Sequence, residues 1–236
     1  MNAAVEKPIL IFGGFLSFPR LYGDMRHTLV ELTGRPVSIV PTLSHDWLGS
    51  MTLYGVSRLL YKLDRAVRQA LSASSASRLT LVCHSVGGVY ARLYLSPKAF
   101  AGRAYCGVNR VDRLITLGSP HHNRGGLTRG GKIARYANRQ CPGACHSDRV
   151  AYTTVAGKSL RGSLHTTRQA RHVFNVYQDL CGDGAVWGDG VVPVQSALLE
   201  NTNQVVLSGV SHFSASGDAW YGSRQVIPLW WQHQPD

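Results

Sequence analysis

The sequence predicts an α/β fold in which a mostly parallel sheet of about six strands is flanked by helices. Short apolar segments rich in β-branched residues alternate with helix-like stretches, and Gly, Pro or Ser stands at most boundaries. This alternation is typical of parallel strands joined by crossover helices. The expected strands are residues 8–12, 37–40, 79–83, 112–117, 150–156 and 204–207.

Helices are expected between these strands. Apolar residues recur at helical spacing from Leu53 to Leu71, which predicts an amphipathic helix lying on the sheet. A second helix should begin at Ser85. A third is expected within residues 221–231 and should end at Pro228.

A stretch with little periodicity follows the fourth expected strand. Residues 121–148 are rich in Gly, Arg and Asn, and we interpret them as an insertion that forms a lid or a basic rim above the carboxyl edge of the sheet. With 236 residues, the chain is long enough for one well-cored domain, so residues 1–236 are expected to form a single domain.

The positive charge is concentrated in one part of the chain. The formal net charge is +12, and residues 121–172 hold ten Lys or Arg against the single acid Asp148, which leaves +9 on this segment. Such a segment is either a solvated basic face or a surface for peripheral contact with an anionic membrane. If it contacts a membrane, that binding should weaken at high salt. No nucleic-acid partner is predicted.

The lack of a recognisable export signal and the cysteine usage predict a cytoplasmic protein. We find no apolar run long enough for a transmembrane segment and no export signal near the N-terminus. The five cysteines are an odd set without a secretory signal, so no disulfide framework is expected. Cys141, Cys145 and His146 suggest a zinc site, but a structural site needs four ligands, so neither a metal nor a cofactor is predicted.

The strongest chemical signal is a serine between an apolar strand and a helix, in the run Leu-Val-Cys-His-Ser-Val-Gly-Gly-Val that centres on Ser85. A nucleophile on such a sharp turn needs small residues two positions to either side, as in G-x-S-x-G. Gly87 obeys this rule, whereas Cys83 departs from it with a bulkier but still compact side chain. The alternative is an ordinary Ser-Gly helix cap after a strand.

A serine nucleophile needs a general base and an acid that orients it, here expected in the order Ser, Asp or Glu, His. Asp189 lies in a glycine-flanked turn 104 residues after Ser85, and His212 follows the last expected strand. We therefore assign Asp189 as the acid and His212 as the base. The carboxylates of Asp179, Asp183 and Asp218 remain rivals for Asp189. His84 directly precedes the serine and is expected to point away from it, whereas His121 and His122 could line the pocket.

Acyl transfer also needs N–H donors for the oxyanion. The N–H of Val86, directly after the serine, is expected to be one donor. The Gly-Gly pair after the first strand should present the N–H of Phe15, or that of Leu16, as the other. Apolar side chains around this mouth would suit an acyl chain, and Leu16 is the predicted substrate contact; the others are Phe15, Phe18, Trp187 and Phe213.

These motifs resemble those of the lipase and esterase branch of the α/β-hydrolase family. Beyond the serine turn, Leu-Gly-Ser-Pro-His at 117–121 resembles a strand-end segment common in lipases, and Asp-Gly-Val-Val-Pro at 189–193 resembles the segment that bears their acid. The resemblance implies that Ser85, Asp189 and His212 are nucleophile, acid and base. The chain departs from the family at Cys83, and it starts at what would be the family's third strand.

The resemblance implies hydrolysis of carboxylic esters, with lipid-like acyl esters as substrates. The first alternative is an acyl-thioesterase or a deacylase of lipid-modified proteins, because these enzymes use the same triad and differ in the leaving group. The second alternative is a non-catalytic α/β-hydrolase-like protein that binds a ligand or an anionic polymer. A binding function alone would not require the serine, the aspartate and the histidine together.

Overall fold

A six-stranded, fully parallel sheet forms the centre of the computed structural model, which describes residues 6–50, 52–124, 129–214 and 217–232. The strand order is β2-β1-β3-β4-β5-β8. This confirms the predicted fold class. The strands are β1 (Ile9–Phe12), β2 (Val37–Ile39), β3 (Leu79–His84), β4 (Val111–Leu117), β5 (Ala151–Lys158) and β8 (Asn203–Ser208). Each lies within two residues of its predicted bounds.

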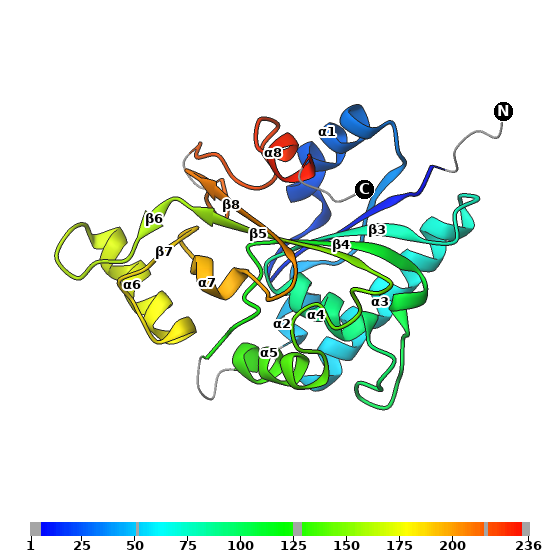
Figure 1. The fold of residues 1–236 in the computed structure, drawn as a ribbon, viewed down its shortest axis with the longest axis horizontal. Helices are drawn as coiled ribbons and strands as arrows, with labels where there is room; N and C mark the ends of the chain where they lie inside the picture. The colour runs from blue at the N-terminus through cyan, green and yellow to red at the C-terminus, as the bar shows by residue number, and fades with distance from the viewer. Residues whose placement is uncertain (1–5, 51, 125–128, 215–216, 233–236) are drawn as a thin grey trace.

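Helices cover both faces of the sheet (Figure 1). On one face, the core includes α3 (Leu53–Ser72) and α4 (Val86–Leu95), with α2 (Ser44–Gly49) packed beside α3. On the other face it includes α1 (Gly23–Thr33) and α8 (Ile227–Trp231). Strands β1 and β3 are buried at every residue, as expected for parallel strands covered on both sides. The remaining short elements are η1 (Pro19–Tyr22), η2 (Gly107–Asn109) and α7 (Val194–Ala197).

The amphipathic helix predicted from residue 53 is α3. Its first turn is capped by Thr52, whose side-chain oxygen accepts a hydrogen bond from the N–H of Gly55. The helix at the C-terminus differs from the prediction. Helix α8 begins at Ile227, so Pro228 stands in its first turn, where the missing N–H of proline costs nothing. Pro228 therefore starts this helix instead of ending it.

The segment interpreted as an insertion contains a regular helix. Helix α5 (Arg129–Gln140) packs against α4 and buries Ile133, Ala134 and Ala137 in the core. The prediction of little periodicity was wrong here, because a few apolar residues spaced three and four apart are hard to recognise among basic ones. Residues 125–128 of the expected lid or rim lie outside the described residues.

A second excursion, which the sequence did not reveal, projects from the carboxyl edge of the sheet (Figure 1). Residues 159–188, called the arm below, comprise β6 (Leu160–Arg161), α6 (Arg168–Cys181) and β7 (Trp187–Gly188), with β6 and β7 paired antiparallel. The basic segment 121–172 is thus divided between α5 and the arm. Within the described ranges, no helix combines the length and the apolar character required to cross a bilayer.

The cysteine prediction needs a correction, because Cys141 and Cys145 form a disulfide with a Cα–Cα distance of 5.3 Å. The turn through Gly143, which has a φ of 53°, brings the two cysteines together. The odd count gave a wrong indication, since one local pair leaves Cys83, Cys106 and Cys181 as free thiols. The three ligand groups of Cys141, Cys145 and His146 do lie within 4.8 Å of one another, but the disulfide consumes both thiolates.

Candidate active site

Ser85 stands at a sharp turn between β3 and α4 with φ 55° and ψ −137°, a conformation that strains a residue with a Cβ. The turn is closely packed. A Cβ at Gly87 would lie 2.1 Å from the carbonyl oxygen of Gly13, so only glycine fits there. Cys83, the departure from the small-residue rule, is completely buried in the core beneath the turn. The predicted elbow geometry is therefore present with a cysteine at its first small position.

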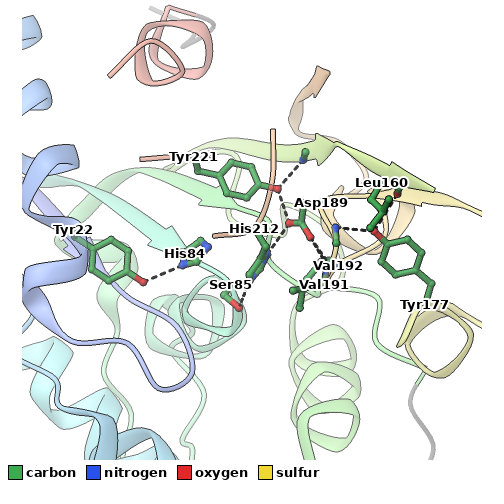
Figure 2. Close-up of polar contacts among 12 residues, drawn as sticks. Tyr22, His84, Ser85, Leu160, Tyr177, Asp189, Val191, Val192, His212 and Tyr221 are labelled. Carbon is green, nitrogen blue, oxygen red and sulfur yellow. Dashed lines mark hydrogen bonds and ion pairs between the residues drawn. The ribbon is translucent and has the colours of Figure 1, made fainter. Parts of the chain in front are cut away.

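The structure brings the three predicted triad residues into one hydrogen-bonded line (Figure 2). Nδ1 of His212 lies 2.7 Å from Oδ2 of Asp189, and Nε2 lies 3.0 Å from Oγ of Ser85. A carboxylate accepts only, so Nδ1 carries the proton that it donates to Asp189. Nε2 of the neutral ring is then free to accept the Ser85 hydroxyl proton, which is the arrangement a general base requires.

Backbone and side-chain donors hold Asp189 in place. Its Oδ1 accepts hydrogen bonds from the N–H groups of Val191 at 2.9 Å and Val192 at 2.7 Å. These bonds belong to the glycine-flanked turn that the sequence singled out. The rival carboxylates are exposed; they are Asp179, Asp183 and Asp218. Among the described residues, Asp189 is the acid that His212 contacts.

Tyr221 is a functional candidate that sequence reasoning missed. Its hydroxyl donates to Oδ2 of Asp189 at 2.8 Å and accepts from the N–H of Gly157 at 2.7 Å. Burial, reinforced by the charge of Asp189, raises the pKa of Tyr221 well above its usual value, so the hydroxyl keeps the proton that it donates. The residue lies 32 positions from Asp189 and belongs to no motif, so only the folded chain reveals the contact.

His84 turns away from the serine beside it and connects the elbow to the Gly-Gly loop. The hydroxyl of Tyr22 is hydrogen-bonded to Nδ1 of His84 at 3.0 Å and accepts from the N–H of Gly14 at 3.1 Å. Burial, with the adjacent His212 as a second cause, lowers the pKa of His84 well below its usual value. A Cβ at Gly14 would lie 2.5 Å from Cβ of Ser85, so the loop rests directly on the elbow.

The two histidines that could line the pocket, His121 and His122, lie apart from the triad. His121 is fully buried, and its Nε2 lies 3.0 Å from Oγ1 of Thr116. Burial is also the main cause that lowers the pKa of His121 well below its usual value. His122 is partly exposed and lies 3.5 Å from Glu200. Neither ring contacts the serine, the acid or the base.

The predicted oxyanion donors flank Ser85. Val86 is the first residue of α4, and the first N–H groups of a helix lack intrahelical partners. Phe15 and Leu16 lie in the loop that rests on the elbow, and in the described part of the chain their N–H groups make no backbone hydrogen bond. Leu16 has a positive φ of 59°, and its side chain is 46% exposed at the mouth.

Comparisons with known proteins find similarity in structure. No protein-family model and no curated protein matches the sequence. A protein from Lactobacillus plantarum WCFS1 named as a cell surface hydrolase shares 13% identity, with a TM-score of 0.56 over 98% of this chain and 92% of its own. The lin2722 product of Listeria innocua (14% identity; 86% and 85% covered; TM-score 0.49) and Est1E of Butyrivibrio proteoclasticus (16%; 89% and 82%; 0.48) are also similar.

Similarity at such low identity establishes the fold. The near-complete overlap with the Lactobacillus protein agrees with the parallel strand order and with the strand–serine turn–helix unit described above. The chain therefore has the α/β-hydrolase fold. Its substrate must be argued from its own residues, because one fold serves many reactions.

The hydrogen bond from Tyr221 can be tested by Tyr221→Phe. Loss of a hydrogen bond to a charged group, about 1.5–3 kcal/mol, should lower kcat on an ester substrate by about tenfold to a hundredfold with little change in KM. Tyr105→Phe is the matched control, because it removes a tyrosine hydrogen bond to the carbonyl of Ser57 far from the triad. Equal kcat values for the two folded variants would show that Tyr221 does not position Asp189.

The burial of His84 and His121 predicts that acid destabilises the fold. Their pKa values are lowered from 6.5, so below this pH the unfolded chain takes up protons that the folded chain does not. As the pH decreases below about 6.5, the free energy of unfolding should decrease by up to about 1.4 kcal/mol per pH unit for each such histidine. Urea unfolding from about pH 7 to about pH 5.5 measures this slope. In His121→Gln the slope should be smaller; an unchanged slope would be inconsistent with a neutral His121.

Proposed function

We propose that the protein is a serine hydrolase that cleaves carboxylic esters of apolar, lipid-like acyl groups. One observation carries the proposal: the Ser85 hydroxyl, at a strained elbow, lies 3.0 Å from an imidazole that Asp189 orients. A serine is a weak nucleophile unless such a base removes its proton. Strain of this kind persists where the surrounding structure holds it, most often at functional sites.

The reaction proceeds in two half-reactions. His212 takes the proton of Ser85 as Oγ attacks the ester carbonyl, and the N–H groups of Val86 and Phe15 stabilise the oxyanion. His212 then gives the proton to the leaving alcohol. Water activated by the same ring hydrolyses the acyl-serine, while Asp189 keeps Nδ1 protonated and stabilises the imidazolium that forms.

The apolar mouth supports an apolar acyl group. Phe15, Leu16 and Phe18 are 41%, 46% and 45% exposed on the loop beside Ser85, and Phe213, next to the base, is 38% exposed. Large apolar side chains grouped at the surface in this way mark a binding site more often than chance exposure. Leu16 would contact the acyl chain, as the sequence predicted.

Kinetics of single and double variants test the triad. Ser85→Ala and His212→Ala should each lower kcat on a short-chain p-nitrophenyl ester by about four orders of magnitude or more, and the double variant should be little worse, since the residues act as a unit. His122→Ala is the control, because its side chain contacts Glu200 and not the triad. Additive losses, or a fully active Ser85→Ala variant, would contradict the mechanism.

The leaving group is decided in the same assay. Acyl esters and acyl thioesters of one chain length are compared on the wild-type protein, and we expect the ester to have the higher kcat/KM relative to its spontaneous hydrolysis. A clear preference for the thioester would favour the thioesterase alternative. Turnover of neither substrate class, with the protein folded, would favour a non-catalytic binding protein.

A further inference from the structure

A cavity of about 410 Å³ lies beside the triad, between the arm and the loop that follows β8. The catalytic line forms part of its wall, through Asp189 and His212, and Phe213 lies next to them. The arm contributes Ser159 and Gln169. Figure 2 shows the relation, with Ser85 on one side of His212 and Leu160, on the arm, beyond Asp189.

The place of this cavity relative to His212 determines what it can hold. If the proposed ester hydrolysis is right, the imidazole must reach the oxygen of the leaving alcohol in order to protonate it. The alcohol therefore lies on the side of His212, whereas the acyl chain follows the apolar side chains of Phe15 and Leu16. The cavity is lined by His212 and not by Ser85, so it is placed for the distal part of an alcohol whose oxygen lies between the imidazole and Ser85.

The wall of the cavity is polar, unlike the apolar mouth. It contains the hydroxyls of Ser159 and Ser211, the amide of Gln169 and the carboxylate of Asp218. In the described part of the chain, no side-chain hydrogen bond or ion pair occupies any of these four groups. Together they offer several hydrogen-bond donors and acceptors in one cavity. A ligand with several hydroxyl groups can bond to them, and an alkyl alcohol cannot.

A second cavity extends the first along the arm. It measures about 600 Å³, shares Ser159 and Leu160 with the first cavity, and includes Thr166, Thr167 and the aromatic ring of Trp187. Trp187 is 43% exposed, although it is a large aromatic residue. The ammonium group of Lys158 lies over the Trp187 ring, 5.4 Å from its centroid, so any stacking on a sugar uses the other face of the ring. The hydroxyl side chains suit the polar edge of a sugar ring, and the added space accepts an alcohol larger than a simple alkanol.

We propose that the cavity between the arm and the β8 loop is the alcohol subsite and that it binds a neutral sugar, with Asp218 and Gln169 hydrogen-bonded to its hydroxyls. In acylation, Oγ of Ser85 forms a bond to the acyl carbon, and the bond from that carbon to the sugar oxygen breaks. The sugar oxygen takes the proton that His212 received from Ser85. The carboxylate of Asp218 disfavours an anionic alcohol in the same position.

The test compares three soluble butanoate esters: butanoylglucose, ethyl butanoate and butanoylcholine. We expect the highest kcat/KM, relative to spontaneous hydrolysis, for the sugar ester. Asp218→Asn and Gln169→Ala should each lower the ratio of sugar-ester to ethyl-ester kcat/KM by about five- to tenfold, the size expected for a lost hydrogen bond. Asp179→Asn, on the exposed side of α6 and outside the cavity, should leave the ratio unchanged.

The outcomes separate this inference from the proposed function. Hydrolysis of ethyl butanoate without preference for the sugar ester, or an unchanged ratio in both cavity variants, overturns the sugar subsite and leaves the ester hydrolase standing. A preference for butanoylcholine that Asp218→Asn abolishes assigns the cavity to a cationic alcohol and also overturns it. Hydrolysis of none of the three esters by the folded wild-type protein contradicts the hydrolase itself.

Discussion

The strained backbone of Ser85 is the constraint on which the rest of the site depends. A residue with a Cβ at φ 55° and ψ −137° costs about 1–3 kcal/mol, and the surroundings must hold it there. The Ser85 N–H donates to the carbonyl of Leu117 at 2.9 Å, and its carbonyl accepts from the N–H of Gly88 at 3.1 Å. The buried strand β3 and helix α4 fix both ends of the turn, so the side chain is directed away from the sheet.

Two tyrosines extend this constraint to both sides of the serine. Tyr22 connects His84, the residue before the serine, to the Gly-Gly loop that bears the predicted oxyanion donor. Tyr221 connects the acid Asp189 to the backbone of β5 at Gly157. Both hydroxyls are buried and each has two hydrogen-bonding partners, so their hydrogen-bonding capacity is largely used. Elements far apart in the sequence are thereby held in one arrangement around His212.

Much of the fold could be predicted from the sequence, because its signals are local. Apolar runs, most of them bounded by Gly, Pro or Ser, marked all six sheet strands, and the small-residue rule around Ser85 marked the elbow. The contacts of Ser85, Asp189 and His212 also have the predicted geometry, since the order of these residues along a parallel sheet places all three at one edge. Their catalytic roles remain predictions.

The parts that could not be predicted depend on packing between distant residues. Tyr22 and Tyr221 belong to no motif, and their contacts arise only when β1, β3, β4 and β5 are assembled in one sheet. Helix α5 was missed because its apolar face consists of few residues within a basic segment. The two-residue strands of the arm carry no periodic signal, whereas α6 buries residues at helical spacing that the sequence does show. The local disulfide of Cys141 and Cys145 was hidden by the odd cysteine count.

The most direct measurement is covalent labelling by a fluorophosphonate probe, followed by mass spectrometry of the labelled peptide. We expect the wild-type protein to carry one label, on Ser85, because the probe reacts with a serine whose proton a neighbouring base accepts. The label should be absent from Ser85→Ala and strongly reduced in His212→Ala. An unlabelled folded wild type, or equal labelling of Ser85→Ala, would contradict an activated serine at this elbow.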